Sequence, residues 1–180
     1  QKLLYLDIYY TVATDERVLP VLLKALDDPS RTVRGGALSA LDRLPKMPKE
    51  AVPCLVRCLK EDDNNTGWRL HVLYRLAELG ADARSARPAT GELLKSDDSE
   101  LKRTALRALV TIGPTEASFL PPLLEAAQAH EALLRAWAIL GIRRLGRAVP
   151  GAVTAEAIPI LEAAVSDPEP RVRLQAAFAL

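Results

Sequence analysis

The chain has 180 residues, of which 49% are hydrophobic and 26% charged, with a formal net charge of +1 and two cysteines. This composition excludes a disordered tail, because the apolar content is too high, and a disulfide-stapled mini-protein, because the cysteines are too few. We expect no membrane span, since no stretch approaches the ~18 consecutive apolar residues that a spanning helix needs. The near-zero net charge gives no electrostatic indication of a nucleic-acid partner.

The sequence repeats itself about every 35 residues. Five apolar helical stretches each carry an early proline, at separations of 33, 35, 33 and 38 residues: Pro20, Pro53, Pro88, Pro121 and Pro159. Each stretch ends at a polar break, and a second helical stretch follows. A period of this length is the sequence pattern of stacked two-helix repeats.

Alignment of the second helical stretches gives columns of constant chemistry. A small-residue column holds Ala37, Val72, Ala105, Ala138 and Ala176. A large apolar column holds Leu41, Leu76, Leu109, Ile142 and Leu180. A basic column holds Arg34, Arg69, Lys102, Arg135 and Arg173. The apolar columns share one face of a helix, and small residues allow neighbouring helices to approach closely.

The boundaries of the second helices follow known capping chemistry. Asp28 and Asp167 each precede a proline, so we expect each carboxylate to cap a helix that has the proline at its first position. Three glycines follow the last apolar residue and are expected to end their helices: Gly80, Gly113 and Gly146.

Two segments, DDPSRTVRGGALSALDRL and SDPEPRVRLQAAFAL, carry the proline, the acidic turn and the Val-Arg opening of the second helix. With them the chain resembles the HEAT-repeat family, in the style of the short bacterial, phycobilisome-lyase-like repeats. The resemblance implies an all-α fold, a right-handed α-solenoid of antiparallel helix pairs with about five repeats, truncated at both ends. We expect the second helix of a preceding repeat at 1–13 and repeats at 14–46, 47–80, 81–113, 114–150 and 151–180, as part of a longer chain with flanking domains.

Two features that could carry chemistry have structural interpretations that we favour. The basic column could bind phosphate, but its fixed distance from the acidic turn indicates a ladder in which each cation lies beside the turn of its own or the next repeat. Cys54 and Cys58 could be redox or metal ligands, but they occupy columns filled by Val21 and Ala25, so we predict small core residues.

The pattern offers no catalytic constellation. His130-Glu131 is similar to the pairs with which the HEAT-like deoxyhypusine hydroxylases hold two irons, but one pair cannot supply a di-iron site. Phosphate loops, nucleophile elbows and Cys-His pairs are missing from the sequence. We therefore expect no enzyme activity, no cofactor and no metal, and a lyase-like role has no support beyond the style of the repeats.

The outward columns of the second helices vary from repeat to repeat, unlike the core columns. In a HEAT-like array these helices line the concave side, so we predict a binding wall made of His71, Tyr74, Arg107, Trp137, Leu140 and Phe178. Exposed aromatic and arginine side chains are typical of binding hot spots. The alternative is that Trp137 and Phe178 pack between adjacent helices and seal the interface.

Two functions of different class remain. The favoured function is a non-catalytic scaffold that binds a protein or peptide partner on this concave wall. The alternative is a nucleic-acid-binding HEAT-like module, supported by the arginines Arg143, Arg144 and Arg147, although 23 acidic residues and a pI of about 8.0 disfavour it. Two cysteines without an evident partner favour a cytoplasmic location.

Overall fold

The computed structural model describes residues 18–44, 46–60, 65–153 and 155–180, and within these ranges every regular element is a helix. The all-α prediction is therefore confirmed, while the predicted helix at 1–13 lies outside the described residues. The chain separates into two compact units, Gln1–Asp63 and Asn64–Leu180. Each unit is described by itself.

The first unit contains α2 (Leu19–Leu26), α3 (Arg31–Leu41), the short 3-10 helix η2 (Lys49–Ala51) and α4 (Val52–Lys60). Helix α2 contacts both α3 and α4. Fully buried leucines lie on all three α-helices, among them Leu26, Leu38 and Leu55. Burying one such side chain stabilises the fold by about 1.5–3 kcal/mol, so this apolar core holds the unit together.

The cysteines belong to the core of the first unit, as the sequence predicted. Cys54 and Cys58 are free thiols, 7% and 1% exposed, and their sulfurs lie 3.8 Å and 4.0 Å from the carbonyl oxygens of Leu23 and Leu26. Burial is the main cause that raises the pKa of the Cys54 thiol. A thiol that stays protonated is a poor nucleophile and a poor metal ligand.

The second unit consists of one second helix, α5, followed by three pairs of a first and a second helix. Its second helices are α5 (Thr66–Leu79), α7 (Ser99–Ile112), α9 (Ala132–Ala148) and α11 (Pro170–Ala179). Its other α-helices are α6 (Arg87–Glu92), α8 (Leu120–Ala127) and α10 (Ala157–Ala164). Three 3-10 helices complete it: η3 (Gly80–Ala86), η4 (Leu93–Lys95) and η5 (Ala117–Phe119).

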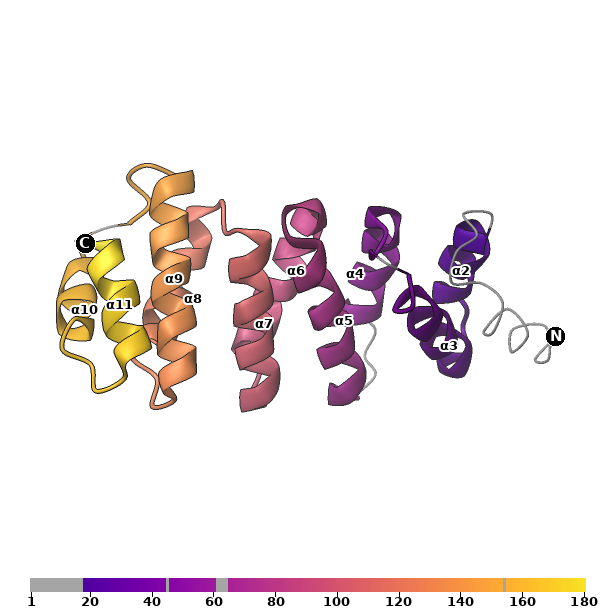
Figure 1. Cartoon of the computed structure of the whole chain (residues 1–180), viewed down its shortest axis with the longest axis horizontal. Helices are drawn as coiled ribbons and strands as arrows, with labels where there is room; N and C mark the ends of the chain where they lie inside the picture. Colours follow the sequence, from indigo (N-terminus) through magenta and orange to yellow (C-terminus); the bar gives the residue numbers. More distant parts are fainter. Residues whose placement is uncertain (1–17, 45, 61–64, 154) are drawn as a thin grey trace. The chain divides into compact units, whose positions relative to one another are not determined.

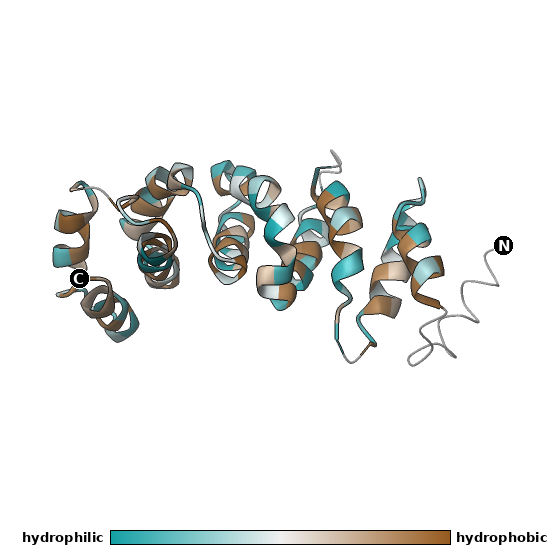
Figure 2. Cartoon of the chain, turned by 90° about the horizontal axis from the view of Figure 1, so that it is seen from above, coloured by the Kyte–Doolittle hydropathy of each residue, from teal (hydrophilic) through white to brown (hydrophobic). Residues whose placement is uncertain are grey.

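The helices of the second unit form two layers. Helix α7 contacts α5 on one side and α9 on the other, and α9 contacts α11, so these four helices stand side by side (Figure 1). Helices α6, α8 and α10 form the other layer, each against its following second helix. Hydrophobic and hydrophilic residues share the circumference of each helix (Figure 2), as expected for helices with one buried face.

The repeat columns explain the close packing of these layers. The small residues Ala105, Ala138 and Ala176 are all 0% exposed. In the large apolar column Leu76 and Leu109 are 0% exposed as well, whereas Leu180 is 64% exposed. The early prolines also lie where predicted, in the first turn of each first helix, where a missing N–H group leaves no bond unmade.

The capping prediction for Asp28 and Asp167 is wrong by two residues. The capping positions belong to Ser30 and Glu169, and the two prolines lie outside the helices. Each aspartate instead accepts a hydrogen bond from the backbone N–H of that capping residue, at 2.7 Å and 2.8 Å. The carboxylates therefore fix the turn that leads into the helix, a local role typical of aspartate before a helix.

Two of the three glycine predictions are confirmed. Gly80 and Gly113 follow the last helical residue with φ of 54° and 93°, a conformation that favours glycine. Gly146 lies inside α9, which continues to Ala148, so the prediction of a stop there is wrong. A Cβ atom at Gly146 would lie 3.0 Å from the Val153 side chain, so this glycine allows the following loop to pack closely on the helix.

Candidate functional site

The second helices of the second unit present their variable columns on the side away from the first-helix layer. Trp137 and Tyr74 lie on α9 and α5, on either side of α7. The outward columns are exposed to different degrees: Thr104 is buried, Trp137 is half-buried, and Tyr74 is exposed. The exposed and half-buried members can contribute to a surface site.

A groove of about 300 Å³ follows α7 on this surface. Helix α7 supplies Arg103, Thr104, Arg107 and Thr111, spaced so that they share one side of the helix. Tyr74 from α5 and the pair Leu133 and Trp137 from α9 complete the lining, which we call the Tyr74 groove.

A cation–π contact crosses the groove. The Arg107 guanidinium carbon lies 5.5 Å from the centre of the Tyr74 ring, and both side chains are exposed. Tyr74 is 39% exposed and Trp137 is half-buried, so neither aromatic side chain is withdrawn completely into the helix interface. The contact holds Arg107 in place. Because the guanidinium lies over the face of the ring, its N–H groups remain available to donate hydrogen bonds to a ligand.

Arg103 has a different electrostatic environment from Arg107. Its guanidinium lies 3.8 Å from a carboxylate oxygen of Glu100 and 3.7 Å from one of Glu131. These exposed ion pairs are longer than hydrogen bonds and offset part of its charge. Arg107 is thus the side chain in the groove whose positive charge is least compensated.

The structure brings together three of the six residues predicted for the binding wall: Tyr74, Arg107 and Trp137. His71, Leu140 and Phe178 do not line the groove. His71 is half-buried and meets the Trp68 ring edge-on, with the ring centres 6.5 Å apart, and Leu140 is half-buried as well.

Phe178 belongs to a second cluster of the same kind. Its ring is 60% exposed on α11, and the Arg143 guanidinium carbon of α9 lies 5.4 Å from its centre. The Phe178 ring is therefore not enclosed between α9 and α11. We call Arg143 and Phe178 the Phe178 site.

Five residues of the Tyr74 groove and the Phe178 site were not among the predicted site residues. Thr104 and Thr111 fall in the variable outward columns and could have been included on that signal. Arg103 and Leu133 stand just beside those columns, and Arg143 was noted for its charge alone. Whether these residues line a site depends on how the neighbouring helices are placed. The repeat columns of the sequence give no information on that placement.

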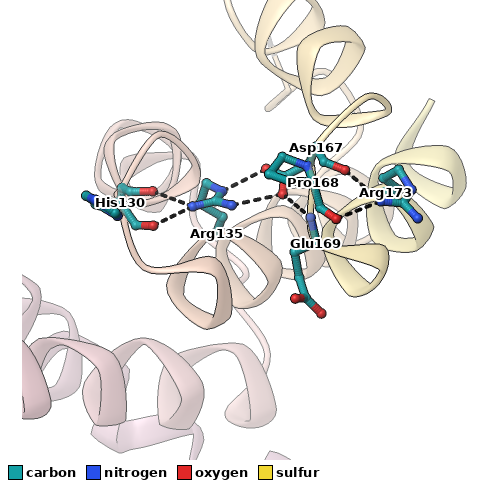
Figure 3. A network of polar contacts seen from close by, with 7 residues as sticks. His130, Arg135, Asp167, Pro168, Glu169 and Arg173 are labelled. Atoms are coloured by element: carbon teal, nitrogen blue, oxygen red, sulfur yellow. Dashed lines mark hydrogen bonds and ion pairs between the residues drawn. The ribbon is translucent and has the colours of Figure 1, made fainter.

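Three of the five members of the basic column form the predicted ladder. These three arginines donate to the carbonyl groups five and six residues earlier, in the turn before their own helix, at 2.6–3.0 Å: Arg34, Arg135 and Arg173. Arg135 also reaches the next repeat, where Nε and Nη2 each lie 2.8 Å from an oxygen of Asp167 (Figure 3). These hydrogen bonds hold the pKa of Asp167 below its usual value.

The described ranges hold no group of three or more His, Cys, Asp or Glu side chains that could bind a metal ion. In the same ranges, no helix combines the length and apolar character needed to cross a membrane. The lining of the Tyr74 groove combines aromatic, aliphatic and cationic side chains with two threonines.

The fold and this surface define an α-solenoid repeat protein. A family model described as HEAT repeats matches residues 87–180, more than half of the chain. The chain therefore belongs to the HEAT-repeat family.

Individual relatives are more distant. A curated protein of Bacillus subtilis (strain 168), "Uncharacterized protein SkfG", is 29% identical over 105 residues, which are 58% of this chain and 60% of that protein. The match thus spans less than two thirds of the relative's length.

Solved structures share the fold at low sequence identity. A designed armadillo repeat protein in complex with the peptide (KR)4 is 19% identical at a TM-score of 0.69, over 91% of this chain and 83% of its own. The CpcE–CpcF complex of phycocyanin lyase from Nostoc sp. PCC7120 is 22% identical at 0.59, over 92% and 99%. An archaeal HEAT-like repeats protein from Thermococcus onnurineus NA1 is 18% identical at 0.60, over 99% and 73%.

Proposed function

We propose that the chain is a non-catalytic module that binds a protein or peptide segment in the Tyr74 groove. The observation that carries this proposal is that Tyr74, Arg107 and Trp137 come from three different helices and line one groove. Tryptophan, tyrosine and arginine are the residues most enriched in binding hot spots. No core function requires them at these outward positions.

The layered packing beneath the groove supports the proposal. Ala105 of α7 and Ala138 of α9 are both 0% exposed, so the groove stands on a close-packed base. A site that exists before binding saves the partner part of the ordering cost. A designed armadillo repeat protein of the same fold has been solved in complex with the peptide (KR)4.

Nucleic acid is the second candidate, because Arg107 and Arg143 each lie over an aromatic ring. Arginine and aromatic side chains together also bind single-stranded nucleic acid. Against it, Arg144 donates to the carbonyl oxygen of Val110, and Arg103 has two carboxylates nearby. Fewer arginines of α7 and α9 are thus available for phosphates than the sequence suggests.

The test is a selection of random 12-residue peptides displayed on phage against the purified chain, followed by affinity measurements on the enriched peptides. Trp137→Ala should weaken binding at least about 30-fold, as expected for loss of a hot-spot residue worth about 2 kcal/mol. Ile158→Ala is the matched control, because Ile158 is 48% exposed on the other helix layer. It should leave the affinity unchanged.

The circular dichroism spectra and melting curves of both variants should match the parent, so that a loss of binding reports the groove. Failure to enrich any peptide would refute the proposal, as would equal affinities for parent and Trp137→Ala. A dT20 oligonucleotide, titrated at several salt concentrations, tests the second candidate, since phosphate binding weakens steeply with salt.

A further inference from the structure

We infer that the partner segment is acidic, with carboxylates about five or six residues apart and an aromatic or aliphatic side chain beside each. This inference rests on the proposed function and adds the chemistry of the ligand. It follows from the positive charge of the Tyr74 groove and of the Phe178 site, and from the distance between their arginines.

The charge of the Tyr74 groove is positive. Two arginines and no carboxylate are among its lining residues, all of which the structure describes. Arg103 is partly offset by Glu100 and Glu131, whereas the interaction that the structure gives to Arg107 is its contact with the Tyr74 ring. A carboxylate at the edge of that ring would meet the guanidinium fork of Arg107, which matches it in geometry.

The Phe178 site combines the same two kinds of group between α9 and α11, with the ring on the helix that follows the arginine instead of the one that precedes it. Arg143 lies over the Phe178 ring, and the ring remains 60% exposed. An exposed phenylalanine beside an arginine offers an apolar surface and a cation to two neighbouring residues of a peptide, one apolar and one acidic. Trp137 lies on the same helix as Arg143 and faces the groove, so apolar surface is available at both places.

The spacing follows from helix geometry. Helices α7 and α9 are neighbours, and packed helices lie about 8–10 Å apart. The Arg107 guanidinium extends from α7 to Tyr74 on α5, whereas the Arg143 guanidinium extends from α9 to Phe178 on α11. The two charged groups are therefore about two interhelical distances apart, ~16–20 Å, which an extended peptide covers in about five or six residues at ~3.3 Å each.

A peptide is favoured over a phosphate backbone by the groups around these arginines. Leu133 lines the groove, and the carboxylates of Glu100 and Glu131 lie beside Arg103. Carboxylates repel a continuous chain of phosphates, while a peptide can place its acidic residues at the two arginines alone. The sign of the charge is opposite to that of the (KR)4 peptide bound by the designed armadillo protein, so that peptide is a suitable negative control.

The experiment compares fluorescein-labelled 12-residue peptides by anisotropy with the full chain. The acidic peptide is (Asp-Phe-Gly)4, the neutral one (Asn-Phe-Gly)4, and the basic one is (Lys-Phe-Gly)4, with (KR)4 beside it. A fourth peptide has the composition of the first with its aspartates clustered at one end. We expect the acidic peptide to bind at least about tenfold more tightly than the neutral or clustered one, and the basic peptides not to bind.

Variants assign the effect to the two places. Arg107→Gln and Arg143→Gln should each weaken the acidic peptide about fivefold, the upper range for one partly exposed ion pair. Arg84→Gln, an equal change of charge on the exposed η3 segment, should leave the affinity unchanged.

The remaining outcomes overturn either this inference or the proposed function. Equal affinity for the acidic, neutral and clustered peptides refutes the inference and leaves the proposed function standing, as does preference for a basic peptide. If none of these peptides and no phage-selected peptide binds, the proposed function fails and this inference with it. Binding of dT20 that is tighter than that of the acidic peptide favours the nucleic-acid function instead.

Discussion

Replacement of Asp167 by Asn removes one negative charge from the joint between α9 and the α10–α11 turn. In the native joint Arg135 donates two hydrogen bonds of 2.8 Å to this carboxylate, and the two side chains are 15% and 10% exposed. The same arginine also donates through Nη1 to the carbonyl oxygens of Ala129 and His130. The guanidinium is therefore held in position and cannot follow a displaced partner.

The expected loss lies between two known limits. Exposed ion pairs contribute about 0–1 kcal/mol, whereas breaking a fully buried pair costs about 3–5 kcal/mol. Because Asp167 and Arg135 are mostly buried, we expect Asp167→Asn to lower the free energy of unfolding of the α10–α11 pair by about 2 kcal/mol. The amide can still accept the backbone hydrogen bond from Glu169 that Asp167 accepts at 2.8 Å, so the turn itself should persist.

The pH dependence has a definite sign. Arg135 is the main cause that lowers the pKa of Asp167 in the folded chain below its unfolded value. A lowered pKa contributes stability that is present above the unfolded value, near 3.8, and is lost as the pH falls through the folded value. The parent and Asp167→Asn should therefore differ fully at pH 7 and converge as the pH falls below about 4 toward 2.

The assay is hydrogen exchange of the α11 amides, which reports the opening of this part of the structure. At pH 7 a loss of 2 kcal/mol should reduce their protection about 30-fold. The amides of α7, which lies elsewhere in the second unit, should keep their protection and serve as an internal control. Unchanged exchange in α11, or a difference that persists undiminished at acid pH, would refute the assigned role of the pair.

Two further predictions concern packing between helices. One repeat earlier, Lys102 and Ala129 stand in the positions equivalent to Arg135 and Asp167, and both line a cavity of about 220 Å³. The double variant Lys102→Arg, Ala129→Asp should form the same ion pair there. Its free energy of unfolding in urea should rise by about 1 kcal/mol more than the sum of the changes in the two single variants. Gly141→Ala should destabilise the chain by about 1 kcal/mol, because the new Cβ would lie 2.6 Å from the buried Leu123 side chain, and overpacking outweighs the gain in helix propensity. Its control is Gly36→Ala, where the Cβ meets nothing within 4 Å, so thermal unfolding should show a gain of about 1 kcal/mol instead.

The repeat and its core could be predicted from the sequence because they depend on local periodicity. A small or large apolar residue at a fixed place in each second helix must be buried when identical units stack, and Ala138, Leu109 and Ile142 are buried as expected. The arginine ladder was also predictable. Three of its arginines, Arg34, Arg135 and Arg173, reach carbonyl groups five and six residues earlier in the chain, so the bond needs only a helix and the turn before it.

The helix ends were less predictable, because the same residue types serve neighbouring positions. Aspartate before proline is compatible with a helix cap or with the turn that precedes it, and the structure has the turn at Asp28 and Asp167. Gly146 resembles Gly80 and Gly113 in sequence, yet its helix continues to Ala148, because contact with the loop that follows also decides where a helix ends.

The sequence by itself determined which columns lie opposite the apolar face, because the helical period fixes on which side of its helix each residue lies. The tertiary structure alone decided which outward residues meet. Tyr74, Arg107 and Trp137 share a groove, whereas His71 turns to Trp68, and Phe178 pairs with Arg143, which was noted only for its charge. The physical reason is that contacts between side chains of different helices depend on the distance, tilt and register of those helices and on side-chain rotamers. These are set by the packing of the whole unit and leave no period in the sequence.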